Sequence, residues 1–220
     1  MKESFISFFL LLFLSVAAWG EVTKVTVNGI AYKIDTEAFT AEVTYPNASE
    51  PGTSEYTGAI SIPSTITYDD TEYNVTAIGD KAFRKASITS LTIPGSVLSL
   101  GTESLRECTL ASLSLPEGLL SIGSKAIYKL PNITELTVPN SVTTLEDYAL
   151  AENSSLTTIT FGENNGNNNW GAWVCWRSSG AYTIYLNCKK KPKLYERALK
   201  NPSIQEGFSI INKKQIAYNR

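Results

Sequence analysis

A similar segment occurs four times between residues 78 and 161, at a spacing of 22 to 23 residues. Each copy contains an isoleucine or leucine followed by glycine or glutamate, then a small residue before a large apolar one, and then a run with regularly spaced apolar residues. The last apolar residues of these runs are Ile93, Leu115, Val138 and Phe161. A unit this short cannot bury its apolar face alone, so neighbouring units must stack. The sequence therefore predicts a β-dominated solenoid with coils of 22–25 residues.

Each repeat predicts one strand of about four to six residues, with apolar side chains inward and the side chains between them outward. These strands are expected to pair in parallel into a long curved sheet. The Ile-Gly and Ala-Phe pairs are expected to form the return half of each coil. There, Gly79, Gly101 and Gly123 would allow a tight bend. Small residues would let adjacent coils approach at Ala82, Ser104, Ala126 and Ala149.

The repeats are flanked by two different ends. Residues 21–77 alternate apolar and polar side chains around Asn28-Gly29 and Asp69-Asp70, which predicts antiparallel hairpins and an N-terminal β cap with lead-in. Residues 162–220 predict two degenerate repeats, with strands near 182–186 and 208–211, and a basic C-terminal cap. Residues 186–220 hold 9 of the 19 basic side chains but only 2 of the 21 acidic ones.

Residues 1–20 have the pattern of a secretory signal peptide. A short basic start precedes an apolar run over 5–18, and Ala18 and Gly20 provide small residues for cleavage after Gly20. A retained membrane anchor is the alternative. No cysteine follows the apolar run, so a lipoprotein anchor is not expected. The predicted location is secreted or cell surface, without a transmembrane segment after cleavage.

The composition argues against several kinds of chemistry. The chain has no histidine, and its three cysteines, Cys108, Cys175 and Cys188, form no Cys-x-x-Cys pair. The commonest general base and zinc ligand are therefore missing. The net charge of −2 implies no general attraction to nucleic acid. The sequence predicts no catalytic residue, no metal and no cofactor.

The repeats resemble the BspA-like leucine-rich repeats of secreted bacterial surface proteins. The motif Ile-Pro-x-x-Val-x-x-Ile-Gly-x-x-Ala-Phe carries this resemblance, in residues 73–83, 93–101 and 138–145. The departures are Glu146 for glycine, and Ser104-Leu105 for Ala-Phe. The resemblance implies a leucine-rich-repeat solenoid, and adhesion to host proteins or to other bacteria. Fold alone does not fix function.

The outward strand positions form two candidate rows for binding a protein or a glycan. One row is Ser90, Ser112, Glu135, Thr158 and Thr183. The other is Thr92, Ser114, Thr137, Thr160 and Tyr185. The alternative is that serine and threonine simply suit an exposed parallel sheet.

Two irregular segments near the C-terminus are further candidates. Trp173 and Trp176, with Trp170 close by, would form a stacking platform if exposed, or would fill a degenerate coil if buried. The basic run at residues 189–193 would attract a polyanion, or else solvate the edge of the last coil. This candidate polyanion patch is Lys189, Lys190, Lys191 and Lys193.

The cysteines have separate interpretations. Cys108 lies two residues before Leu110, where the other repeats have Ala86, Pro131 and Ser154, so it is expected to fill a small packed slot. In one interpretation Cys175 and Cys188 pair after export, and in the other a hairpin between them leaves them too far apart. The sequence leaves both possibilities open.

These patterns favour an exported protein that works by surface recognition of a host or bacterial protein or glycan. A structural envelope protein without a soluble ligand is the first alternative. A carboxylate-based glycan hydrolase is the second, and it would need two acids converging in a cleft. The acidic residues are instead scattered through predicted loops.

Overall fold

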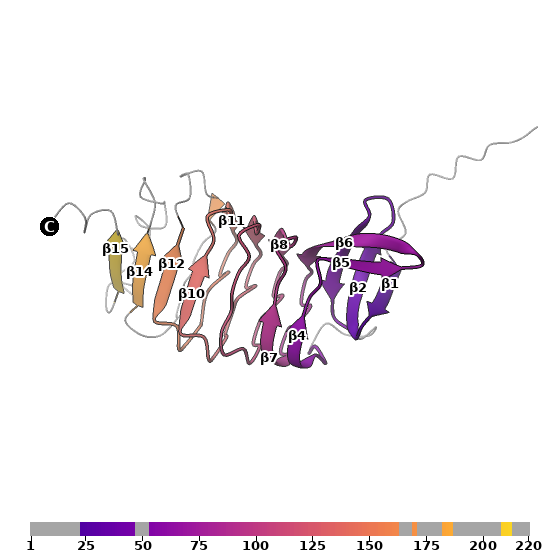
Figure 1. The fold of residues 1–220 in the computed structure, drawn as a ribbon. Helices are drawn as coiled ribbons and strands as arrows, with labels where there is room; N and C mark the ends of the chain where they lie inside the picture. The colour runs from indigo at the N-terminus through magenta and orange to yellow at the C-terminus, as the bar shows by residue number, and fades with distance from the viewer. Residues whose placement is uncertain (1–22, 47–52, 163–168, 171–181, 187–207, 213–220) are drawn as a thin grey trace, which may run out of the picture.

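The computed structural model describes residues 23–46, 53–162, 169–170, 182–186 and 208–212. Every regular element assigned in them is a β-strand. The coils stack along one axis, from the N-terminal strands at one end to β15 at the other (Figure 1). No helix in this part of the chain is long and apolar enough to cross a membrane.

The N-terminal cap contains the predicted antiparallel strand pairs, joined by one parallel pairing between its third strand and the strand that leads into the repeats. Its strands are β1 (Thr23–Val27), β2 (Ile30–Asp35), β3 (Thr40–Thr44), β5 (Thr65–Tyr68) and β6 (Thr71–Ile78). Both predicted turns have left-handed backbone at their two central residues, with φ of 49° and 79° at Asn28 and Gly29, and 48° and 55° at Asp69 and Asp70. Two-residue turns of this kind match the twist of the flanking strands.

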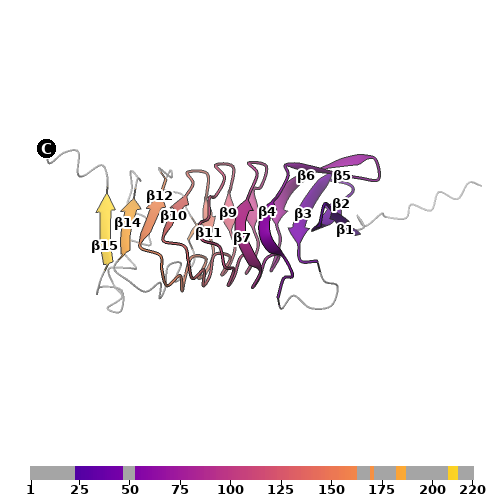
Figure 2. The same ribbon diagram turned by 60° about the horizontal axis from the view of Figure 1, so that its bottom comes forward.

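The repeat strands pair in parallel. β4 (Thr57–Ser61) pairs with β7 (Ser87–Thr92). A second ladder follows in the order β10 (Glu135–Val138), β12 (Thr158–Phe161), β14 (Tyr182–Leu186) and β15 (Phe208–Asn212). The C-terminal strands expected near 182–186 and 208–211 are thereby confirmed. Since β4 belongs to this parallel pairing, the stacking begins before the first regular repeat (Figure 2).

The prediction of one strand in every repeat is wrong for residues 110–115, which form no strand. Their side chains still follow the pattern, because Leu110, Leu113 and Leu115 are buried. The difference lies in the hydrogen bonding at the start of the segment. Ile88 O, a carbonyl of β7, accepts from the hydroxyl of Thr109 at 3.0 Å. The backbone of residues 111–115 makes no ladder bond to β7, and β7 and β10 belong to separate sheets.

The regular coils contain a second, shorter strand that the sequence did not predict. β8 (Ser99–Leu100), β9 (Ser121–Ile122), β11 (Thr144–Leu145) and β13 (Asn169–Trp170) continue the sheet that starts with the cap and β6. The Ile-Gly positions therefore form a parallel ladder of their own. Trp170 pairs with Leu145, so it occupies the position that isoleucine or leucine fills in the regular repeats.

The repeat needs its glycines because neighbouring coils approach closely, and not because the chain bends tightly. None of Gly79, Gly101 and Gly123 is among the residues with positive φ, so the expectation of a bend that needs glycine is wrong. A Cβ at Gly123 would lie 2.9 Å from Gly101 C, Leu100 O and Thr102 N. Gly101 and Gly123 thus make room for main-chain atoms of the preceding coil, whereas a Cβ at Gly79 would meet the side chain of Glu42 in β3.

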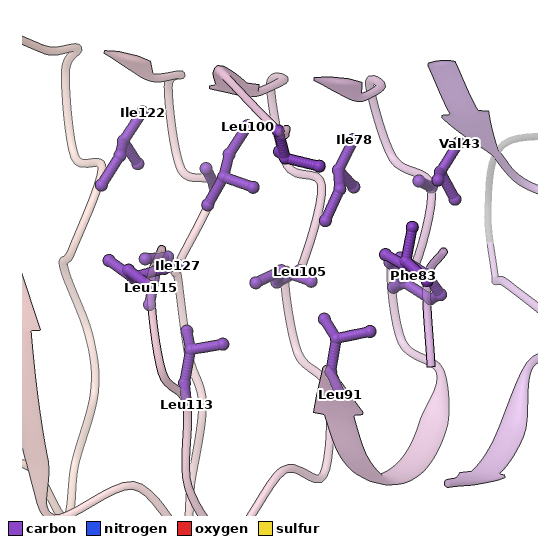
Figure 3. Packing of buried hydrophobic residues seen from close by; sticks show 14 of the residues in the cluster. Val43, Ile78, Phe83, Leu91, Leu100, Leu105, Leu113, Leu115, Ile122 and Ile127 are labelled. Atoms are coloured by element: carbon purple, nitrogen blue, oxygen red, sulfur yellow. The ribbon is translucent and has the colours of Figure 1, made fainter. Parts of the chain in front are cut away.

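The core is a set of apolar rows that run along the stack. Val43, Ile78, Leu100 and Ile122 form one row, and Phe83, Leu105 and Ile127 form another (Figure 3). All are 2% exposed or less. Burying one such side chain stabilises the fold by about 1.5–3 kcal/mol. The rows hold the outward strand and turn residues at fixed spacing.

Candidate functional site

The outward side chains of the repeat segments form a surface that we call the hydroxyl face. In the described residues it consists of Ser90, Thr92, Ser112, Ser114, Glu135, Thr137, Thr158 and Thr160. The register places Glu135 beside Thr158 and Thr137 beside Thr160. All eight are exposed except Thr158 and Thr160, which are half-buried. The two rows predicted from the sequence therefore lie side by side on one surface.

The chemistry of the hydroxyl face is that of hydrogen bonding. Each hydroxyl can both donate and accept, and Glu135 carries the one charge among these eight residues. Between Ser90 and Glu135, the backbone of residues 111–115 has no hydrogen bond to another part of the protein. The middle of this face thus also presents unpaired backbone groups. The face contains no acid pair of the kind that glycan hydrolysis requires.

Several predicted site residues lie at or beyond the limits of the described structure. Thr183 and Tyr185 belong to β14, where the register places them beside Thr158 and Thr160. Their side chains lie outside the description. The same holds for all of Trp173, Trp176, Cys175, Cys188 and the lysines 189, 190, 191 and 193. Their proposed roles stay predictions.

A second surface, which the sequence reasoning missed, is built from the turns that carry the Ala-Phe pairs. We call residues 80–85, 102–107, 124–129 and 147–152 the turn face. Its backbone forms a ladder, since Lys85 N donates to Arg106 O at 2.7 Å and Glu107 N to Tyr128 O at 2.9 Å. Lysine and glutamate alternate at a spacing of 22 residues at 81, 103 and 125, a signal visible by stacking the repeats.

Ion pairs join the first two turns of this face. Arg84 Nη1 lies 3.2 Å from Glu103 Oε2, and Lys85 Nζ lies 3.9 Å from Glu107 Oε2. Burial alone would raise the pKa of the Glu103 carboxyl. The hydrogen bond and charge of Arg106, together with the charges of Arg84 and Lys81, lower that pKa below its usual value. Glu103 is therefore held as a carboxylate.

Residues 76–205 match the family described as BspA type leucine rich repeat region, in 6 copies. The chain belongs to this family. Its BspA-type repeats therefore extend beyond the four regular copies, into the segment that contains β14. A search of curated proteins finds no match.

Solved structures similar to the chain are also leucine-rich repeat proteins. A leucine-rich repeat protein from Bacteroides capillosus ATCC 29799 is 27% identical, with a TM-score of 0.51, over 63% of this chain and 97% of the other. A leucine rich cell surface protein from Faecalibacterium prausnitzii A2-165 is 18% identical, with a TM-score of 0.39, over 77% and 56%. The leucine-rich repeat protein of T. pallidum is 14% identical, with a TM-score of 0.48, over 85% and 98%.

The BspA-type repeats place Cys108 in a buried slot, but its equivalents differ from those predicted. Ala86 and Cys108 are buried as expected, whereas Pro131 and Ser154 are exposed. The buried residues at the matching place are Leu130 and Asn153. In coils of 23 residues the extra residue follows this slot. Counting back two positions from the first apolar residue of the strand segment therefore gives a residue one position too late in the sequence.

A hydrogen bond and burial both keep the Cys108 thiol protonated and unreactive toward electrophiles. Its Sγ donates a hydrogen bond to Phe83 O at 2.8 Å, and burial raises its pKa to about 12. Only the thiolate is nucleophilic. We expect native protein at pH 8 to leave Cys108 unmodified by iodoacetamide, and unfolded protein to be fully modified. Peptide mass spectrometry measures both, and rapid native labelling of this residue would contradict the described packing.

The described residues show no metal site. No group of three or more histidine, cysteine, aspartate or glutamate side chains in this part of the chain could hold a metal ion. The acidic side chains near one another on the turn face are instead placed beside cations, as at Glu103 and Glu107. These two surfaces present hydrogen-bonding groups and charges to solvent.

Proposed function

We propose that this protein is exported and acts in recognition or adhesion at the cell surface, binding a protein or a glycan through the hydroxyl face. The observation that carries the proposal is that outward hydroxyl side chains, exposed at Ser90, Thr92, Ser112, Ser114 and Thr137, lie in two rows over a packed core. A preformed surface loses little conformational entropy on binding. Membership of the BspA-type family and the apolar segment at 5–18 support export.

The hydroxyl face favours a ligand that is itself rich in hydrogen-bonding groups. Its residues are small and polar, and the backbone of residues 111–115 adds further donors and acceptors. A neutral glycan or an extended polypeptide meets this requirement. The single carboxylate of Glu135 gives no basis for general acid–base work, so we propose a binding function without catalysis.

The test is a glycan and protein array, probed with the chain lacking its predicted signal peptide. For a ligand found there, the double variant Ser112→Arg, Thr137→Arg should weaken binding by about tenfold or more, because two bulky charges cover the face. The matched control is Thr67→Arg, Thr143→Arg, which makes the same change at exposed threonines elsewhere and should leave Kd unchanged. Calorimetry measures both.

Other results would separate the alternatives. Equal affinities of the hydroxyl-face variant and the wild type would remove this face as the binding site. A chain that binds nothing on the array would favour a structural envelope protein. Release of sugars from an array glycan would favour the hydrolase, although the described residues contain no acid pair arranged for it on the hydroxyl face.

A further inference from the structure

The strand β4, at the start of the parallel repeat strands, has one edge on which no strand of the described residues pairs. β4 and β7 form a two-stranded sheet, so β7 occupies one side of β4 only. Just after β4, Ile62 N donates to Thr92 O at 3.0 Å. Since the backbone groups of successive residues point to opposite sides of a strand, Ile60 also faces β7, while Ala59 and Ser61 face away. The N–H and C=O groups of these two residues therefore point to the open edge.

The open edge of β4 is accessible to solvent. Its outward residues Thr57, Ala59 and Ser61 are all exposed, and none of the five residues of β4 is charged. Proteins commonly protect an open edge with lysine or proline, because unpaired backbone groups are a template for another strand. β4 contains neither residue. Its edge is therefore free to pair with an added strand.

The N-terminal cap covers two of the inward rows of the core at the end where β4 lies. Val43 O accepts a hydrogen bond from Gly79 N at 2.8 Å, so β3 precedes the row that contains Ile78. The ring centre of Tyr56 lies 4.9 Å from that of Phe83, so an aromatic side chain precedes the second row. These two rows thus begin under cover.

The third inward row begins at β4, and no described strand precedes it. The register places Ile60 beside Leu91. Ile60 is half-buried, whereas Leu91 and Leu113 are 8% exposed. Further along the row, Leu136 and Ile159 are 2% and 0% exposed. The least buried apolar side chain of the row therefore lies at the same edge as the unpaired backbone groups.

We propose that the open edge of β4 is a docking site for an extended polypeptide segment of a partner protein, which adds a strand to the repeat sheet. The backbone of Ala59 and Ser61 bonds to this segment, and one of its apolar side chains covers Ile60. The bonded edge is short, because a β-bulge interrupts the register between Gly58 and Ala59. The affinity is therefore modest.

An extended polypeptide fits both features of this edge. Its N–H and C=O groups repeat at the spacing of a strand, and its side chains alternate, so an apolar residue can face the core while its neighbours face solvent. Another whole solenoid does not fit, because the cap extends beyond β4 along the stack and prevents an end coil from lying against it (Figures 1 and 2). The inference does not rest on the hydroxyl face, since it uses the edge of the sheet.

The experiment measures binding of a labelled peptide to the full chain without its predicted signal peptide. The probe is a fluorescein-labelled peptide with the sequence of residues 132–140, which has the spacing of a regular repeat strand. Fluorescence anisotropy should show saturable binding. A peptide with Leu136→Asp should bind about tenfold more weakly or worse, because it lacks the apolar side chain that covers Ile60.

Ser61→Pro tests the edge itself. Proline removes the N–H that points to the open edge and leaves the bonds to β7 intact, and the extended residue before it tolerates proline. The Kd of the peptide should rise about tenfold or more. Ser61→Ala is the matched control, since it keeps the N–H and should bind like the wild type. The hydroxyl-face variant Ser112→Arg, Thr137→Arg should also bind the peptide normally, which separates the two sites.

Hydrogen exchange of the wild type gives a measurement that needs no variant. The amides of Ala59 and Ser61 should exchange fast in the free chain and slowly with the peptide bound, because only the bound state gives them an acceptor. A wild type that binds no peptide overturns the proposal. So does a Ser61→Pro variant with the wild-type Kd, a peptide that leaves the exchange of both amides unchanged, or loss of peptide binding in the hydroxyl-face variant.

Discussion

Replacing Gly101 by alanine should lower the free energy of unfolding by about 2–3 kcal/mol. The added Cβ would lie 2.6 Å from Asp80 N and 2.8 Å from Gly79 C, both main-chain atoms of the preceding coil. These atoms cannot move away easily, because Gly101 N donates to Ile78 O at 2.7 Å across the same pair of coils. Chemical denaturation, followed by far-ultraviolet circular dichroism, measures the change.

Gly95 provides the matched control. It is exposed, it is not among the residues with positive φ, and a Cβ there would meet nothing within 4 Å. Gly95→Ala should therefore be neutral, or stabilise by up to about 1 kcal/mol through the unfolded chain. Equal stability of the two variants would show that coil spacing does not depend on glycine at position 101.

The fourth coil shows how the repeat tolerates a side chain at the glycine position. Glu146 replaces glycine there and keeps the ladder bond from its N–H to Ile122 O at 2.9 Å. Its carboxylate also accepts a hydrogen bond from Ser124 N at 2.9 Å. A specific side-chain bond thus compensates for the lost close approach. Alanine at Gly101 offers no such bond, so Glu146 does not weaken the prediction.

Much of the fold could be predicted from the repeat pattern, because burial acts on individual side chains. Leu136, Ile159 and Leu156 are inward from their spacing alone, and they are 2% exposed or less. The hairpins were predictable for a local reason, since Asn28-Gly29 and Asp69-Asp70 adopt the left-handed backbone that such turns need. These features depend on residues near one another in the sequence.

Features that depend on contacts between coils were not predictable from one repeat. β8 and β9 are two residues long, too short for a periodic pattern, and they exist through pairing with neighbours. Likewise, residues 110–115 have the spacing of a strand and form none. Whether backbone groups meet depends on the exact register of neighbouring coils, which the spacing within one repeat does not reveal.

Of the two candidate surfaces, the hydroxyl face could be predicted from the sequence and the turn face could not. The hydroxyl face follows from alternation along each strand, and the rows were recognisable in the sequence. The turn face needed the ladder that brings Lys85, Glu107 and Lys129 into one line. Its charges were visible in the sequence, but only the stacked coils bring acids and bases of neighbouring turns beside one another.

Asn153 is the second residue with a large expected effect, because a buried polar side chain links two coils. Its Nδ2 donates to Ile127 O at 3.0 Å and to Leu150 O at 2.8 Å. Its Oδ1 accepts from Leu130 N at 2.8 Å, and the residue is 0% exposed. Replacement by alanine would leave Ile127 O and Leu130 N buried without these bonds, at about 1–3 kcal/mol for each group.

We therefore expect Asn153→Ala to reduce the free energy of unfolding by about 3 kcal/mol, measured by chemical denaturation. Asn132→Ala is the control, because Asn132 is exposed and donates one bond, to Thr109 O at 3.0 Å, so its loss should cost less than about 1 kcal/mol. Asn153→Leu separates packing from hydrogen bonding. Leu130 fills the equivalent slot one coil earlier, so leucine fits there and lacks only the polar contacts. If Asn153→Leu is as stable as wild type, the amide bonds contribute nothing and shape alone decides the slot. If it is destabilised like Asn153→Ala, the side chain of Asn153 is what ties the third and fourth coils together.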